Sequence, residues 1–142
     1  MKYPPQLVDP MREELTRLGV EELRTSDEVE DVLDDREGSV MVVVNSVCGC
    51  AAQNARPAVE LALEHDVTPD RSVTVFAGQD AEATEKAREY FTGYRPSSPQ
   101  IALFSDGSLR HMIQRHEIEG RSAEEIAGDL KEAFEEHCGA VA

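Results

Sequence analysis

The segment SVMVVVN (residues 39–45) decides the fold of this chain. A short run of mainly β-branched, apolar residues is typical of a strand buried on both faces, as in parallel sheets. The next residues are SVCGCAAQNARP (46–57), and residues 51–65 have the pattern of a helix, in which Pro57 predicts a kink. Two of the three cysteines of the chain, Cys48 and Cys50, are therefore expected where a buried strand leads into a helix.

The residues before this strand predict a helix, a short strand and a second helix. The first helix is expected over 10–18, with Asp9 as its N-cap and Gly19 after its end. Residues 20–24 can form a short strand, and Thr25 begins a capping box that opens the second helix.

The residues after the cysteines predict two more strand and helix units. They are a buried strand at 72–78, a helix capped by Asp80 and ending near Phe91, a hairpin over 100–118 that turns at Asp106-Gly107, and a last helix opened by Ser122.

From residue 39 the order is β-α-β-α-β-β-α. Strand–helix–strand units require parallel pairing, whereas the hairpin adds antiparallel strands. The expected fold is therefore α/β and thioredoxin-like, with a central mixed sheet flanked by helices. We expect one domain over residues 1–142, with a helical or βα extension at 1–38 and a core at 39–137.

The composition excludes some partners and suggests a compartment. The chain has 29 Asp and Glu against 14 Lys and Arg, a net charge of −15, and such an acidic protein repels nucleic acid and anionic membranes. No apolar run approaches the ~18–20 residues of a membrane span, and MKYPPQLVDP (1–10) lacks the features of a signal peptide. We expect a cytoplasmic protein, in which paired cysteines are usually catalytic rather than structural.

The predicted chemistry is thiol–disulfide exchange at Cys48 and Cys50. The unpaired N–H groups and the dipole at a helix N-terminus favour a thiolate, so Cys48 is assigned as the nucleophile and Cys50 as the resolving thiol. A disulfide between them closes a very small ring, and Gly49 is the residue best able to adopt the backbone angles that this ring requires.

Other readings of the cysteines remain open. Two cysteines can simply pack as small apolar side chains. A Cys-x-Cys pair can also hold copper or zinc, with His137 and Cys138 as further ligands, or serve iron–sulfur assembly. Because zinc prefers four clustered ligands, we expect no metal site.

Pro99 is the second candidate site residue, because it directly precedes a predicted strand. In a thioredoxin-like sheet this position is typically a cis-proline that faces the active cysteine, and Ser98-Pro99 occupies it. The backbone of Ser98 is then expected to pair with an incoming thiol conjugate. Arg56 is expected to be only a solvated or ion-paired side chain.

From Pro10 to Gly120 the chain closely resembles the bacilliredoxin family of bacterial thioredoxin-like proteins. The resemblance rests on PMREELT, VVVNSVCGCAAQNARP, VFAGQD, ATEKAREYF, PSSP and RHEIEG. It implies an enzyme that removes bacillithiol, a low-molecular-weight thiol, from S-bacillithiolated client proteins.

The resemblance also implies the roles of the two cysteines. Cys48 would take up the bacillithiol and Cys50 would assist or resolve. Bacillithiol is the implied thiol co-substrate, with no bound cofactor, and a flavin-dependent reductase would restore the system downstream. The alternatives are a general protein disulfide isomerase and a metal-binding or iron–sulfur assembly protein.

Overall fold

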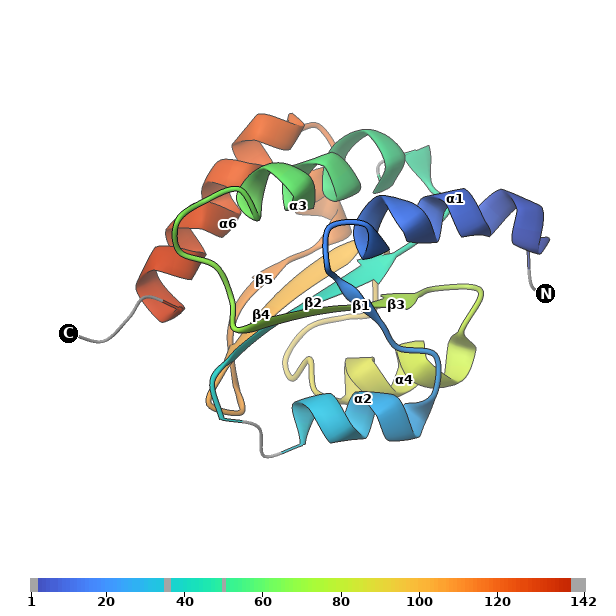
Figure 1. Cartoon of the computed structure of the whole chain (residues 1–142), viewed down its shortest axis with the longest axis horizontal. Coiled ribbons are helices and arrows are strands. Elements are labelled where there is room, and N and C mark those ends of the chain that lie inside the picture. Colours follow the sequence, from blue (N-terminus) through green and yellow to red (C-terminus); the bar gives the residue numbers. More distant parts are fainter. Residues whose placement is uncertain (1–2, 35–36, 50, 139–142) are drawn as a thin grey trace.

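The computed structural model describes residues 3–34, 37–49 and 51–138. Its five strands form one mixed sheet in the order β1-β3-β2-β4-β5. Helices α1, α3 and α6 lie on one side of the sheet and α2 and α4 on the other (Figure 1). The strands are β1 (Glu21–Glu22), β2 (Ser39–Asn45), β3 (Arg71–Phe76), β4 (Gln100–Ser105) and β5 (Ser108–Ile113). The helices are α1 (Pro5–Thr16), α2 (Ser26–Leu33), η1 (Ala51–Ala55, a π-helical turn), α3 (Arg56–Ala62), α4 (Ala81–Glu89), α5 (Arg115–Ile118) and α6 (Ala123–His137).

Strand β2 is the centre of the sheet. It pairs in parallel with β3 and antiparallel with β4, and all seven of its residues are buried. Val40, Val42 and Val44 pack in the core with α2 and α4, whereas Met41 and Val43 pack with α3 and α6. The predicted strand with two buried faces and the predicted mixed sheet are both confirmed.

The first helix begins earlier than the sequence pattern predicts. Helix α1 starts at Pro5 with Pro4 as its N-cap, so Asp9 is not a cap and Pro10 lies inside the helix. The fixed φ of proline suits the first helical position, so Pro4-Pro5 can start the helix one turn before Pro10. Gly19, with φ of +90°, lies in the turn after this helix.

The other predictions for the N-terminal extension are confirmed. Glu21–Glu22 form the edge strand β1, which pairs in parallel with β3. Thr25 and Glu28 form the predicted capping box at the start of α2. The extension thus adds an edge strand to the sheet and a helix to each of its faces.

The predicted kink at Pro57 takes the form of a change in helix type. A π-helical turn, Ala51–Ala55, precedes α3, and Pro57 lies in the first turn of α3. Proline has no N–H to donate to the carbonyl four residues earlier, so the regular hydrogen-bond ladder is interrupted at this point. Helix α3 ends at Ala62, three residues before the predicted end.

Two predictions in the second half need correction. Asp80 is the N-cap residue of α4, but its side chain makes no capping hydrogen bond because its carboxylate binds Arg12 instead. The second strand of the hairpin ends at Ile113, because the short helix α5 begins at Arg115. The turn at Asp106-Gly107, where both residues have positive φ, is confirmed. The capping box of Ser122 is also confirmed.

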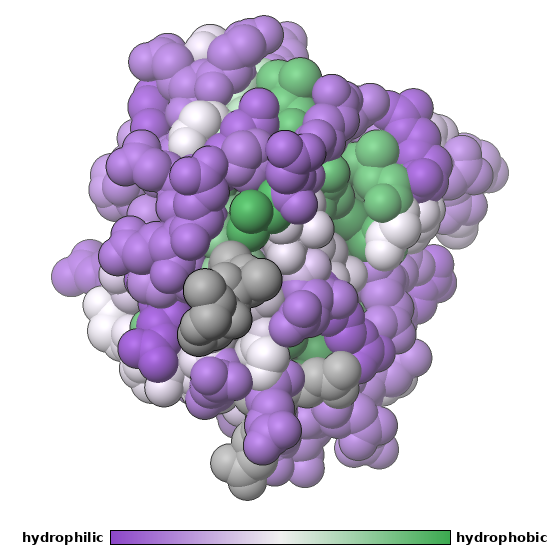
Figure 2. Space-filling model, turned by 60° about the vertical axis from the view of Figure 1, so that its left-hand side comes forward, coloured by the Kyte–Doolittle hydropathy of each residue, from purple (hydrophilic) through white to green (hydrophobic). Residues whose placement is uncertain are grey.

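The molecular surface is largely hydrophilic on the face shown in Figure 2. Among the described residues, the large apolar side chains that are exposed are those of Tyr3, Leu7 and Tyr94. Within the described ranges no helix is long and apolar enough to cross a membrane.

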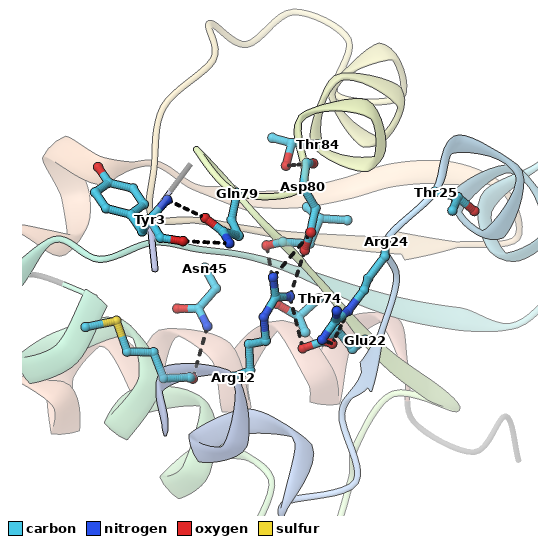
Figure 3. Close-up of polar contacts among 12 residues, drawn as sticks. Tyr3, Arg12, Glu22, Arg24, Thr25, Asn45, Thr74, Gln79, Asp80 and Thr84 are labelled. Carbon is cyan, nitrogen blue, oxygen red and sulfur yellow. Dashed lines mark hydrogen bonds and ion pairs between the residues drawn. The ribbon is translucent and has the colours of Figure 1, made fainter. Parts of the chain in front are cut away.

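Arg12 on α1 ties this helix to the sheet. Its guanidinium lies 2.7 Å from Asp80 and 3.2 Å from Glu22 (Figure 3). The ring of Phe76 lies 5.1 Å from it. Arg12 is only 6% exposed. Removing one partner from a buried ion pair is costly, because the remaining charges lose their compensation.

We therefore expect Arg12→Ala to lower the free energy of unfolding by about 3–5 kcal/mol. The matched control is Arg17→Ala, because Arg17 pairs with Glu60 through a side chain that is 60% exposed. Exposed pairs of this kind contribute about 1 kcal/mol or less. Urea unfolding of both variants measures the difference, and equal losses would contradict the role assigned to Arg12.

Candidate active site

Cys48 lies three residues after the end of β2, where the chain turns into the helical segment that contains η1 and α3. Its carbonyl oxygen accepts hydrogen bonds from the N–H groups of Ala51 (3.0 Å) and Ala52 (3.2 Å), so Cys48 occupies the N-terminus of this helical segment. Its side chain is half-buried, and its sulfur is disulfide-bonded. The predicted strand-to-helix position of Cys48 is confirmed.

The predictions for the other two residues of the CGC motif, Gly49 and Cys50, differ in how far the structure bears on them. Cys50 lies outside the described residues, so its resolving role stays a prediction. Gly49 is exposed, helical, and outside the left-handed region of φ, and a Cβ at this position would meet no atom within 4 Å. Its backbone is therefore not left-handed, and its expected role in the site stays a prediction.

A buried hydrogen-bonded cluster supports the loop of residues 46–48, which connects β2 to the helical segment. The Arg56 guanidinium donates from Nη1 to Asn45 Oδ1 and to the Ser46 carbonyl, at 2.9 Å each. Ser46 N donates to Asn45 Oδ1 (2.9 Å), and Cys48 N donates to Ser46 Oγ (3.2 Å). Arg56 is 3% exposed. Of the two alternatives expected for Arg56, the ion-paired one is confirmed by Glu14. The solvated one is wrong, because the helical segment after Cys48 turns this side chain inward.

Helix α1 completes the same cluster. The Asn45 amide donates to the Met11 carbonyl at 3.2 Å (Figure 3). Glu14 accepts a hydrogen bond from Arg56 Nε at 3.0 Å. Sequence spacing gave no sign of this link, because more than 30 residues separate the partners. The N-terminal extension therefore supports the loop that carries Cys48.

The Ser98–Pro99 peptide bond is cis, as predicted from its place before β4. Pro99 is buried, and Ser98 lies with Cys48 in the lining of one surface cavity. The structure thus brings together Cys48 and Ser98, 50 positions apart in the sequence.

This cavity of about 350 Å³ also contains residues that the sequence pattern did not single out: Arg88 of α4, Arg115 of α5, and Tyr3. Tyr3 is held there by a reciprocal pair of hydrogen bonds between its backbone and the Gln79 side chain (Figure 3). Burial lowers the pKa of Arg88 from its ordinary value, an effect that Glu85 partly opposes. Arg88 and Arg115 lie in the quoted segments ATEKAREYF and RHEIEG, but local spacing does not show that they share a cavity with Cys48, since the lining comes from separate segments.

The third cysteine lies at the opposite end of β2. Cys138 ends α6 with a free, half-buried thiol whose pKa is raised by burial, although a hydrogen bond with Ser39 opposes this shift. Ser39 begins β2 and Cys48 follows its end, and six residue steps of a strand span about 20 Å. Cys138 and the neighbouring His137 therefore cannot share a metal ion with Cys48. The described residues contain no group of three or more His, Cys, Asp or Glu side chains that could hold a metal.

Comparison with solved structures identifies the fold. The chain superimposes on a mutant thioredoxin from Halobacterium salinarum with a TM-score of 0.56 and 20% identity, covering 86% of this chain and 93% of that one. It matches oxidised mitochondrial thioredoxin 3 of Saccharomyces cerevisiae with a TM-score of 0.56 and 17% identity, covering 87% and 98%. The predicted thioredoxin-like fold is confirmed.

Comparison of sequences identifies the family. The family model described as disulphide isomerase matches residues 3–138. The chain is 57% identical to a bacilliredoxin of Koribacter versatilis over 99% of this chain and 97% of the relative. It is 60% identical to a bacilliredoxin of Salinibacter ruber (98% and 83%) and 54% identical to one of Bacillus licheniformis (96% and 96%). With Cys48 at the helix start and Ser98 in the same cavity, the chain belongs to the bacilliredoxin family of thiol-disulfide oxidoreductases.

Proposed function

We propose that this enzyme removes bacillithiol from protein mixed disulfides in the cytoplasm, with Cys48 as the attacking residue. The observation that carries the proposal is the high similarity, over nearly the whole chain, to proteins named bacilliredoxin. The location of Cys48 supports it, because its side chain lines an open cavity at the start of a helical segment.

The first step is an exchange of disulfide partners. The thiolate of reduced Cys48 attacks the bacillithiol sulfur of the client's mixed disulfide, so the bond between that sulfur and the client sulfur breaks. A new disulfide joins Cys48 to bacillithiol, and the client cysteine leaves as a thiolate that takes a proton from water. The helix N-terminus favours the attacking thiolate through its unpaired N–H groups.

The second step returns Cys48 to its reduced form. A second bacillithiol thiolate attacks the bacillithiol sulfur of the adduct, which yields bacillithiol disulfide and the Cys48 thiolate. Alternatively, Cys50 attacks the sulfur of Cys48, which releases bacillithiol and leaves the Cys48–Cys50 disulfide. Either disulfide then needs two electrons, which we assign to bacillithiol and a flavin-dependent reductase.

The cis Ser98–Pro99 segment is proposed to position the mixed disulfide. Ser98 shares the cavity with Cys48, so the backbone groups of this segment are close to the place where a bound conjugate would lie. Backbone pairing with an extended substrate is a common mode of peptide recognition, and it does not depend on the client's sequence.

Protein disulfide isomerisation is the second candidate function. The description of the matching family model, disulphide isomerase, favours it. Both functions begin with attack by Cys48, but isomerisation acts on disulfides between two protein cysteines. Recovery of activity in a scrambled disulfide protein, compared with release of bacillithiol from a modified client, separates the two.

The two cysteines of the motif are expected to act at different steps of the transfer. We expect Cys48→Ala to abolish transfer of bacillithiol, whereas Cys50→Ala retains the first step and accumulates an adduct of one bacillithiol on Cys48. Whole-protein mass spectrometry after mixing each reduced variant with a bacillithiolated client measures both results. Cys138→Ala is the control and should behave as the wild type, because Cys138 lies at the opposite end of β2. Transfer by Cys48→Ala would contradict the proposed nucleophile.

Arg56 is expected to act on Cys48 as a positioning residue. Removing its positive charge beneath the loop should favour the protonated thiol, so Arg56→Gln should raise the pH midpoint of Cys48 alkylation by about one unit. Iodoacetamide alkylation of the reduced protein across pH measures the midpoint. Arg56→Lys keeps the charge, so its alkylation midpoint should stay close to that of the wild type even if this variant is less stable. A loss of stability without any change in midpoint would show that Arg56 acts on folding alone.

A further inference from the structure

We propose that the cavity beside Cys48 binds a carboxylate of the small thiol that is exchanged there, with Arg88 and Arg115 as its ligands. This inference rests on the proposed function and deepens it, because it names the residues that would recognise the small thiol.

The charge of the cavity lining carries the inference. Two of its nine residues are arginines and none is acidic, although Asp and Glu make up 29 of the 142 residues of the chain. Two other surface cavities of the protein mix both signs. One contains Glu21 and Asp70 beside its arginine, and the other contains Asp9, Glu13 and Glu22 beside two arginines.

The two arginines have donors directed at the same loop. Arg88 donates from Nη2 to the Ser97 carbonyl at 2.8 Å, and Arg115 donates from Nη1 to the Ser98 carbonyl at 3.3 Å. Arg115 also pairs through Nε with Glu119, in an exposed contact of 3.1 Å. Both cations are thus anchored at the cis-proline segment, in the same cavity lining as Cys48.

The described residues do not satisfy every donor of the Arg88 guanidinium. Its Nε is buried and donates to no partner among the described residues. A buried donor without a partner costs free energy, and a charged acceptor supplies the strongest compensation. A guanidinium binds a carboxylate through two parallel hydrogen bonds, so a second arginine nearby fits the same group from another side.

The size of the cavity favours a small thiol over a segment of the client. About 350 Å³ lies at the lower end of the range for small-molecule sites. With its carboxylate held in the cavity, the small thiol presents its sulfur to Cys48. The exchange is then balanced: the Cys48 thiolate displaces R′S⁻ from RS–SR′ and forms the Cys48–SR disulfide.

The overall charge of the protein cannot by itself produce a preference for an anionic disulfide. A net charge of −15 repels an approaching anion at long range, but salt screens that repulsion beyond a Debye length of about 8 Å. Only local cations can therefore make an anionic disulfide a better substrate than its neutral analogue.

The test compares 3,3′-dithiodipropionic acid with its diamide, which differ in charge but little in size. The measured quantity is the rate of adduct formation on Cys48 in reduced Cys50→Ala protein, divided by the rate of the same disulfide with a free small thiol. We expect this relative rate to be roughly tenfold higher for the acid than for the diamide. A change of that size is what one hydrogen bond to a charged group is expected to give. Arg88→Gln and Arg115→Gln should each remove most of this preference, whereas Arg88→Lys should keep part of it.

The control variant is Arg71→Gln, whose arginine pairs with Glu21 at the β1–β3 edge of the sheet. It should keep the full preference. Equal rates for acid and diamide in protein that retains both arginines would overturn the inference while leaving the proposed function intact. Equal slowing of both disulfides by the arginine variants would also overturn it, because that result indicates a structural role. Failure of every disulfide to modify Cys48 would overturn the proposed function as well.

Discussion

The buried guanidinium of Arg56 is the interaction on which the site depends. It joins the end of β2, through Asn45 and Ser46, to Glu14 on α1. Ser46 in turn accepts the N–H of Cys48, so the cysteine is positioned through a chain of hydrogen bonds that begins at one buried cation. A buried charge of this kind requires partners on every side, and these partners fix the loop relative to the sheet.

The net charge of the whole chain and the charges of the residues around Cys48 have opposite signs. The whole chain is strongly acidic, which keeps polyanions away. Around Cys48, however, the fold gathers a helix N-terminus, a buried arginine beneath the loop and two arginines in the cavity, without an acidic side chain in the lining. Thiolate chemistry depends on the local arrangement, because nearby charges act at short range and through little water.

Much of the fold could be predicted, because its signals are local. The apolar run of β2, the capping boxes at Thr25 and Ser122, and the Asp106-Gly107 turn each depend on residues a few positions apart. The sequence pattern places the start of α1 too late, because Pro5 and Pro10 both suit the first helical turn and the pattern does not distinguish them. Asp80 was misassigned as a side-chain cap because its partner, Arg12, is 68 residues away.

Three features could be derived from the sequence alone: the order of strands and helices along the core, the place of Cys48 between strand and helix, and the position of Pro99 before β4. They follow from periodicity and from the spacing of residues along one segment. Three others required the folded structure: Arg56 faces inward, α1 contacts the cluster under the Cys48 loop, and Arg88, Arg115 and Tyr3 line one cavity with Cys48. The reason is physical: a cavity is made by segments that the sheet brings together, and no local pattern encodes which distant side chains will face one another.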